Sequence, residues 1–364
     1  MEHKIEDIRK LKSRVEEQLE RPELGLVKDE DIKTLAKAKL EKRLKWGYKP
    51  TYAEQLSNLL QFAQSLPSLK MENVDDQGSS KQWLYGVPSE FLQIIYGGII
   101  KMSGSYYEDE STTLEESMIK DMDSCCEKAN VKEGHSVLDI GCGYGSLIIH
   151  IAKKYRTCNV TGITNFVEQK QYIMEECKKL NLSNVEVIVG DGTTINLNTT
   201  TFDRVFVTGM LEEINDYKLF LKSVSDWMKP DGLLLVTHFC HKTFAYQNNK
   251  ALDDEDWHNE YIFPSGNLIV PSASLLLYFQ EDLSVVSHWA TNGTHTGRTC
   301  KKLVERIDAN IEKIKEIFSE FYGSKEDAIR MINYWRVLCI TGAEMYTCKD
   351  GEEWMDVYYL FKKK

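Results

Sequence analysis

The sequence lacks the features that mark secreted, membrane-spanning or metal-binding proteins. No apolar run approaches the length of a membrane span, and the residues after Met1 are charged rather than apolar. The nine cysteines are scattered, with Cys125 and Cys126 adjacent, and no Cys-x-x-Cys pair occurs. We therefore expect no disulfide framework, no metal site and a location in the reducing cytoplasm.

The sequence also has no excess of positive charge. It contains 45 Lys and Arg against 56 Asp and Glu, which gives a formal net charge of −11. This balance disfavours binding to nucleic acid and stable association with anionic membranes, and it is compatible with a cationic substrate. The chain has 364 residues, of which 42% are hydrophobic, so we expect one enlarged domain or two.

Hydrophobic spacing predicts a helical region at the start of the chain. Apolar residues recur every three or four positions over 5–19, the pattern stops at Pro22, and it resumes over 32–44. Further helices are expected over 51–66 and 112–128. A polar, glycine-containing stretch at 71–80 predicts a surface loop.

From residue 136 the pattern changes to strands that alternate with helices, which is typical of a parallel sheet covered on both faces. A turn at 229–232 leads into the fifth strand, and a long amphipathic helix is expected over 303–321. The last two strands would close the sheet in antiparallel fashion. The predicted strands are 136–140, 159–163, 185–189, 204–208, 233–238, 285–289 and 356–361, and the helices among the first five are 146–154, 167–180 and 216–228.

The first of these strands runs directly into a glycine turn. Gly141, Gly143 and Gly145 alternate there, Asp139 precedes them, and a helix follows from Ser146. Missing side chains let a backbone approach a ligand closely, and a helix N-terminus supplies free N–H groups. A dinucleotide site would want glycine in place of Ser146.

This glycine turn resembles motif I of the S-adenosyl-L-methionine (SAM) methyltransferases. The resemblance implies an α/β fold with a Rossmann-like class I methyltransferase sheet. On this basis we expect three regions. Residues 1–120 would form an N-terminal helical region that contributes to the cofactor and substrate pocket, and residues 121–240 a SAM-binding core. Residues 241–364 would form a substrate lid with long helices and the closing antiparallel strands.

Polar residues follow three further predicted strands, at the edge where doubly wound sheets bind ligands. Asn165 and Gln169 follow the second strand, Asp191 and Gly192 the third, and a Glu-Glu pair the fourth. Taken singly, each group is a common turn or helix cap. Their recurrence at neighbouring strand ends favours a cofactor site.

Several motifs carry a closer resemblance. The segments SGSYY from Ser103, TLEE from Thr113, DIGCGYG, TNFVEQ and GMLEE resemble the cyclopropane-fatty-acid-synthase-like superfamily. Within it, WGY from Trp46, VPSEFLQ from Val87 and HFCHKTFAY from His238 are similar to the plant coclaurine and related alkaloid N-methyltransferases, over roughly residues 40–364. The family's cofactor contacts map onto Ser103, Gly141, Asn165, Gln169, Asp191 and Val207.

The expected reaction is methylation of an amine, which requires a free lone pair. An alkylamine has a pKa near 10 and is protonated at neutral pH, so a group must accept that proton. Glu212 and Glu213, just past the fourth strand, are candidates, and His238 at the end of the fifth strand is a third. The alkaloid enzymes commonly carry a Glu-His pair with another Glu three residues earlier; this chain has Glu213 in place of the His and Gly209 in place of the earlier Glu.

The acceptor should be apolar apart from one amine, such as a benzylisoquinoline, a protoberberine or a phenylalkylamine. Aromatic side chains can line such a pocket and stabilise a cation face-on. A homodimer is compatible with the sequence, which does not set the oligomeric state. The predicted substrate contacts are Tyr85, Phe91, Gly209, Phe239, Phe244 and Phe263.

Two alternatives stay open at this point. Cyclopropane synthases of the same superfamily use a bound bicarbonate as base, in a pocket that needs a cysteine and a tyrosine; the matching positions here are Gly104 and Thr296, which disfavours lipid chemistry. A catalytically silent SAM-binding protein is the other alternative, suggested by the missing histidine.

Overall fold

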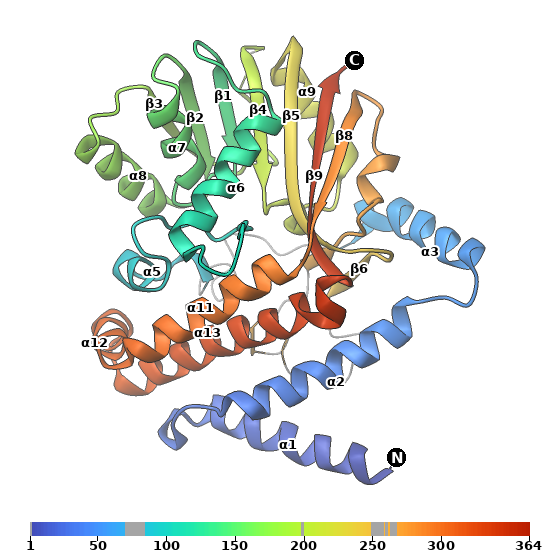
Figure 1. Ribbon diagram of the computed structural model, residues 1–364, viewed down its shortest axis with the longest axis vertical. Helices are drawn as coiled ribbons and strands as arrows, with labels where there is room; N and C mark the ends of the chain where they lie inside the picture. The colour runs from blue at the N-terminus through green and yellow to red at the C-terminus, as the bar shows by residue number, and fades with distance from the viewer. Residues whose placement is uncertain (1, 70–83, 198–199, 249–257, 259–260, 263–267) are drawn as a thin grey trace.

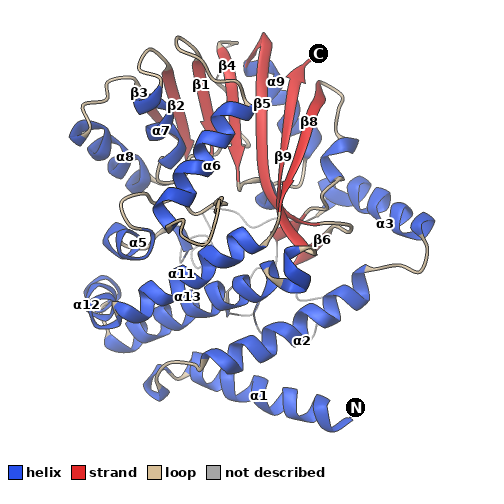
Figure 2. Ribbon diagram, viewed as in Figure 1, coloured by secondary structure: helices blue, strands red, loops and turns tan. Residues whose placement is uncertain are grey.

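The computed structural model describes residues 2–69, 84–197, 200–248, 258, 261–262 and 268–364 (Figure 1). Its centre is a seven-stranded sheet in the order β3-β2-β1-β4-β5-β9-β8, flanked by helices (Figure 2). The predicted surface loop at 71–80 lies outside the described residues. The strands of this sheet are β1 (Ser136–Ile140), β2 (Asn159–Thr164), β3 (Val185–Val189), β4 (Phe202–Thr208), β5 (Met228–His241), β8 (Leu283–Thr291) and β9 (Trp354–Lys363).

Strands β1 to β5 run parallel, as the sequence predicts, and β9 joins them in antiparallel fashion. Successive residues of β4 face opposite sides of the sheet: Val205 and Val207 enter one hydrophobic core, and Phe206 enters another. This burial on both faces explains why the strands read as nearly continuous apolar runs.

The predicted turn at 229–232 is wrong in one respect, because β5 begins before it. Phe202 of β4 pairs with Met228 and Arg204 pairs with Leu233, so the Pro-Asp-Gly segment is a bulge inside the strand. A Cβ on Gly232 would lie 2.9 Å from the carbonyl oxygen of Lys229, which explains the glycine. The turn residues therefore bend the strand without ending it.

The two faces of the sheet carry different helices. Helices α6 (Leu114–Lys128), α7 (Ser146–Lys154) and α8 (Val167–Lys179) pack on the core that contains Phe206. Helices α9 (Tyr217–Trp227) and α3 (Tyr52–Ser65) join the opposite core. Helix α6 begins with a capping box between Thr113 and Glu116, worth about 1 kcal/mol, so part of the TLEE motif is a helix start.

A second group of helices lies beyond the carboxyl ends of the parallel strands (Figure 1). Its members come from both ends of the chain and share one hydrophobic core. Asn333 joins the two ends, because its side chain accepts from the N–H of Val27 at 3.0 Å and donates to the carbonyl of Gly25 at 3.2 Å. The helices are α1 (Glu2–Glu20), α2 (Asp29–Gly47), α5 (Ser89–Tyr96), α11 (Thr294–Ala309), α12 (Ile311–Tyr322) and α13 (Lys325–Tyr346).

The single long helix predicted over 303–321 is instead two helices. Asn310 separates α11 from α12 with φ of −120°, and its side-chain amide donates to the carbonyl of Arg306 at 2.9 Å. The amide thus replaces a helical partner for that carbonyl, which ends α11. Within the described part of the chain, no helix is long and apolar enough to cross a membrane. The division at 120 and 240 stays a prediction.

Candidate active site

Two cavities meet at the carboxyl ends of β1, β4 and β5. The smaller, of about 170 Å³, lies over the glycine turn after β1. The larger, of about 360 Å³, lies between the strand ends and helices α2, α11 and α13. The residues that line both cavities are Tyr85, Lys101, Met102, Ser103, Gly209 and Glu213.

The glycine turn forms the floor of the smaller cavity. Gly141 and Gly143 line it with φ of 76° and 54°, values that favour glycine. A Cβ on Gly143 would meet nothing within 4 Å among the described residues, whereas one on Gly145 would lie 2.6 Å from Ile173 of α8. The space above Gly143 is thus free for a ligand, and Gly145 serves the packing of α7 against α8.

Asp139 lines the same cavity at the end of β1. Its side chain is 2% exposed, and its Oδ1 has no hydrogen-bond partner in the described part of the chain. Burial raises the pKa of Asp139 to about 7, and Lys101 opposes this rise. A buried carboxyl with an unused oxygen suits a cationic ligand, so the residues present fit SAM, which carries an ammonium and a sulfonium group.

The other predicted cofactor contacts divide into two groups. Ser103, Asn165, Gln169 and Gly192 line the smaller cavity. Asp191, Val207 and Gly145 are not among its lining residues. The Oδ1 of Asp191 instead accepts from the backbone N–H and the hydroxyl of Thr193 at 2.8 and 2.7 Å, and Val207 is fully buried in the sheet core. As the structure stands, Asp191 shapes a turn beside the cavity.

Glu212 lies in the wall of the larger cavity, in a short 3-10 turn (η3, Leu211–Glu213) after β4. The residue is 7% exposed. One oxygen, Oε1, accepts from the backbone N–H of Phe239 at 3.0 Å, and Oε2 has no partner among the residues described. Burial raises the pKa of Glu212 to about 8, although two backbone hydrogen bonds oppose it. The group is therefore a stronger base, once ionised, than an exposed glutamate.

Glu213 lies at the junction of the two cavities. The hydroxyl of Tyr85 approaches its Oε1 at 3.4 Å, and both side chains line both cavities. The carboxylate and the phenol thus lie at the boundary between the cofactor space and the acceptor space. The structure brings Glu212 and Glu213 to one wall, as the sequence predicts.

His238 lines the larger cavity and is 1% exposed; it lies within β5, which continues to His241 instead of ending at residue 238 as predicted. Its Nδ1 lies 3.0 Å from the carbonyl oxygen of Phe239, and because a carbonyl only accepts, Nδ1 carries the proton. Its Nε2 then has a lone pair, and it has no partner in the described structure. Burial lowers the pKa of His238 to about 4, so the ring is neutral at pH 7 and accepts a hydrogen bond more readily than a proton.

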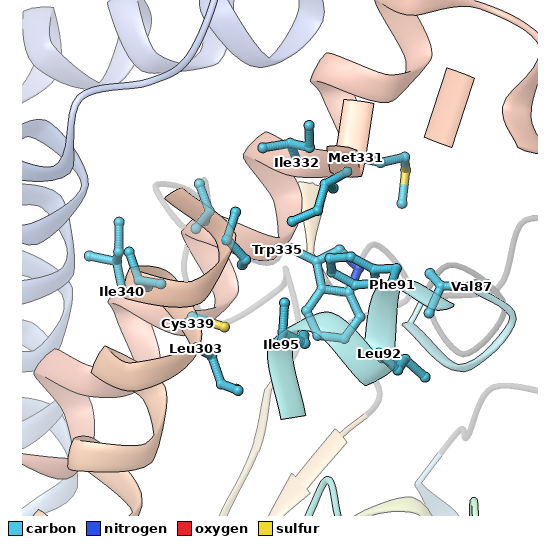
Figure 3. Close-up of a cluster of buried hydrophobic side chains, with 14 of the residues drawn as sticks. Val87, Phe91, Leu92, Ile95, Leu303, Met331, Ile332, Trp335, Cys339 and Ile340 are labelled. Carbon is cyan, nitrogen blue, oxygen red and sulfur yellow. The ribbon is translucent and has the colours of Figure 1, made fainter. Parts of the chain in front are cut away.

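Two of the predicted substrate contacts are core residues. Phe91 is fully buried, and its ring centroid lies 4.6 Å from that of Phe318 and 4.9 Å from that of Trp335. Figure 3 shows the ring of Phe91 beside that of Trp335. Phe244 stacks on His241 at 3.6 Å and fills the space beside Gly47. Neither Phe91 nor Phe244 lines the larger cavity.

The remaining substrate contacts fall as follows. Tyr85, Gly209 and Phe239 line the larger cavity, and Phe263 lies outside the described residues. Gly209 has φ of 63°, and a Cβ there would point toward the Cβ of Ser103 at 3.8 Å. Glycine at this position therefore leaves the boundary between the two cavities open.

Sequence reasoning missed the charged groups Lys39, Arg43, Lys101 and Asp356, which all line the larger cavity. Asp356 of β9 is 6% exposed and accepts from the hydroxyl of Thr296 at 2.5 Å; burial raises its pKa to about 6. Arg43 of α2 is also buried in this wall. Their burial was the missing information, since an aspartate in a predicted strand and an arginine in a charged helix give no local signal.

A buried ion pair supports the boundary between the cavities. Lys101 and Asp121 lie 2.7 Å apart, and each side chain is 3% exposed. Lys101 also donates to Ser103 Oγ at 3.0 Å and to the carbonyl of Gly104, and Tyr358 donates to Asp121 at 2.5 Å. The pair is satisfied on both sides, as a buried pair must be, and it fixes the segment that holds Ser103.

The chain matches known proteins over nearly its whole length. The model of the mycolic acid cyclopropane synthetase family matches residues 73–330. Pavine N-methyltransferase of Thalictrum flavum subsp. glaucum is 52% identical over 347 residues, 95% of this chain and 96% of that protein. (S)-Coclaurine N-methyltransferase of Papaver somniferum is 47% identical over 353 residues, 96% of this chain and 98% of that protein.

The fold of the chain also matches that of a solved relative. The crystal structure of coclaurine N-methyltransferase bound to N-methylheliamine and SAH has a TM-score of 0.91 and 45% sequence identity to this chain, covering 96% of it and 99% of that chain. Because the family model matches well over half of the residues and these relatives match almost all of them, the chain belongs to the mycolic acid cyclopropane synthetase family, in its branch of SAM-dependent amine N-methyltransferases.

Proposed function

We propose that this protein methylates the nitrogen of a small amine that carries aromatic rings, of the benzylisoquinoline, protoberberine or phenylalkylamine type. The observation that carries the proposal is the buried carboxyl group of Glu212 in the wall of a mostly apolar cavity, beside Glu213 at the boundary with the cofactor cavity. The similarity to enzymes named for pavine and coclaurine supports this substrate class.

Glu212 and Glu213 form an acidic wall of the larger cavity, and this wall can take the proton from the incoming amine. The amine arrives as an ammonium ion, which needs an acceptor for its proton before the nitrogen can react. Before the amine binds, Glu212 carries its proton at neutral pH, because burial raises its pKa to about 8. An ammonium ion nearby favours the ionised carboxylate, so binding releases the proton of Glu212 to solvent and leaves a carboxylate that can act as a base. Glu212 Oε2 then accepts the ammonium proton and frees the lone pair.

The remaining residues position the nitrogen and exclude water. SAM supplies an electrophilic methyl group on its sulfonium. His238 Nε2 offers a lone pair that can hold an N–H of the acceptor, and Tyr85 fixes the carboxylate of Glu213 at the boundary. Gly209 leaves room for the two reacting groups to approach in line, which methyl transfer requires.

Cyclopropanation of a lipid is the second candidate, because the family is named for it. It would need an anion, bicarbonate, beside positions 104 and 296. Asp356 lies there: Thr296 donates to its Oδ2, and a Cβ on Gly104 would be 3.4 Å from the same oxygen. A second anion at this place would meet a carboxylate instead of the hydroxyl and thiol it requires, which argues against lipid chemistry.

The test is incubation of the protein with methyl-labelled SAM and three panels: secondary and tertiary benzylisoquinoline or protoberberine amines, phenylalkylamines, and phospholipids with unsaturated chains. Label in an amine that carries a new N-methyl group supports the proposal. Label in the lipid would establish the second candidate. SAH binding by calorimetry without label transfer to any panel would indicate a silent SAM-binding protein.

We also propose that the protein acts in the cytoplasm and does not associate stably with membranes. The nine cysteines are scattered along the sequence without a Cys-x-x-Cys pair, which is compatible with a reducing compartment. Fluorescent tagging in a plant cell tests the location. Association as a homodimer stays a prediction, which light scattering of the purified protein would check.

A further inference from the structure

Arg43 is a buried cation in the wall of the acceptor cavity. Its side chain is 7% exposed, it lines the larger cavity, and its Nη2 has no hydrogen-bond partner among the described residues. A buried donor without a partner is unfavourable, and native structures seldom keep one without a reason. A ligand of the cavity that carries a hydrogen-bond acceptor would supply the missing partner of Arg43 Nη2.

Aromatic rings hold the guanidinium group of Arg43 in place. Its Cζ lies 4.4 Å from the ring centroid of Tyr246 and 5.2 Å from that of Trp46. Rings bind a guanidinium through its faces, so the N–H groups at its edge stay available for hydrogen bonds in the plane. The group is thus fixed before any ligand arrives.

The wall that contains Arg43 differs in charge from the wall that contains Glu212. Lys39, one helical turn before Arg43 on α2, also lines the cavity and lies 3.5 Å from Nδ1 of His258. Figure 1 shows α2 on the far side of α13 from the ends of β4 and β5, which carry the acidic wall. The cavity therefore has Glu212 and Glu213 near the cofactor space, where Lys101 is already paired with Asp121, and the cations Lys39 and Arg43 along α2.

We propose that Arg43 binds an oxygen atom on a ring of the acceptor, so that the enzyme recognises its substrate at two poles: the amine by the carboxylates and a ring hydroxyl by the guanidinium. This inference rests on the proposed function. A charged donor prefers an oxygen acceptor to water-free apolar surface, and an acceptor that lacks the oxygen leaves the donor buried and unpaired. The enzyme thus selects oxygenated aromatic amines over unsubstituted ones.

The test compares three acceptors: 1-benzyl-1,2,3,4-tetrahydroisoquinoline without oxygen, with one hydroxyl on the isoquinoline ring, and with one hydroxyl on the benzyl ring. The wild-type protein should prefer one hydroxylated amine over the unsubstituted one by about 10- to 100-fold in kcat/KM. Arg43→Met should abolish this preference, and Arg43→Lys should keep part of it. Lys45→Met, which removes an exposed positive charge two residues later on α2, should leave it unchanged.

The preference is a ratio measured within one protein sample, so partial unfolding of a variant does not change it. An Arg43→Met variant that loses activity equally toward all three amines would show that Arg43 only supports the fold, and an unchanged preference would show that it does not contact the oxygen. Equilibrium binding of the same amines in the presence of SAH tests the Arg43 contact independently of the proposed methylation. If no amine is methylated, the proposed function fails, while a binding preference that disappears in Arg43→Met would still establish the oxygen contact.

Discussion

Glu212 and Phe239 are joined by a single hydrogen bond of 3.0 Å, from the backbone N–H of Phe239 to Oε1 of Glu212. This bond links the turn η3, which follows β4, to β5 and fixes the carboxyl group by one oxygen. The second oxygen, Oε2, stays unpaired within the described structure and is the atom that we assign to the ammonium proton.

Glu212→Gln should therefore lose methyl transfer at pH 7 while it keeps the fold. The amide oxygen can still accept from Phe239, but the group no longer accepts a proton, which typically costs about 10²- to 10⁴-fold in rate. Raising the pH toward 10 should partly restore activity, because more of the amine is then already neutral. Glu320→Gln, an exposed position on α12, is the control. A Glu212→Gln, Glu213→Gln double variant with wild-type turnover at pH 7 would end the hypothesis.

The raised pKa of Glu212 also predicts how the stability of the ligand-free protein depends on pH. The folded carboxyl keeps its proton up to about pH 8, whereas the unfolded one loses it near 4.5. Folding is then coupled to proton uptake, so this contribution is full below pH 4.5 and lost as the pH rises to 8, by up to about 1.4 kcal/mol per pH unit. Urea unfolding at pH 5, 6, 7 and 8 should show a smaller decline for Glu212→Gln than for wild type. Parallel declines would mean that the carboxyl is hydrated.

His238→Ala should weaken amine binding or turnover and leave the affinity for SAH unchanged, because His238 lines only the acceptor cavity of the two. His288→Ala is a matched control, since His238 and His288 both stack on Tyr359, with ring planes 7° and 14° from parallel, and His288 of β8 does not line the cavity. Equal effects of the two substitutions on kcat/KM would reduce His238 to a packing role.

Gly143→Val should abolish SAH binding measured by calorimetry, because its side chain would enter the open space above the glycine turn. Gly134→Val controls for backbone strain, since Gly134 also has a positive φ, of 80°, and open space at its Cβ position, yet it lies before β1 and away from both cavities. Each variant should lose about 1–2 kcal/mol of stability. Unchanged SAH affinity in Gly143→Val would show that the cofactor site has been misplaced.

The sequence predicts the cofactor side of the site better than the acceptor side, for a physical reason. Gly141, Gly143 and Asp139 lie within one strand and turn, so local spacing reveals them. Phe91 and Phe239 are both aromatic residues beside predicted elements, and only the packing of α5 against α12 and α13 separates the core ring from the cavity ring. Asp356 and Arg43 come from opposite ends of the chain, and no local sequence pattern indicates that both line the same cavity.

The order of strands in the sheet has a consequence for how the chain is made. β9 is the last strand in the sequence, yet it lies between β5 and β8 and is the neighbour of β8 within the described sheet. While residues 292–353 are still being synthesised, β8 is complete in sequence but its pairing partner β9 has not yet been made. The strands around the glycine turn can assemble earlier, whereas the acceptor cavity, which needs Asp356 of β9, closes only when synthesis reaches the final strand.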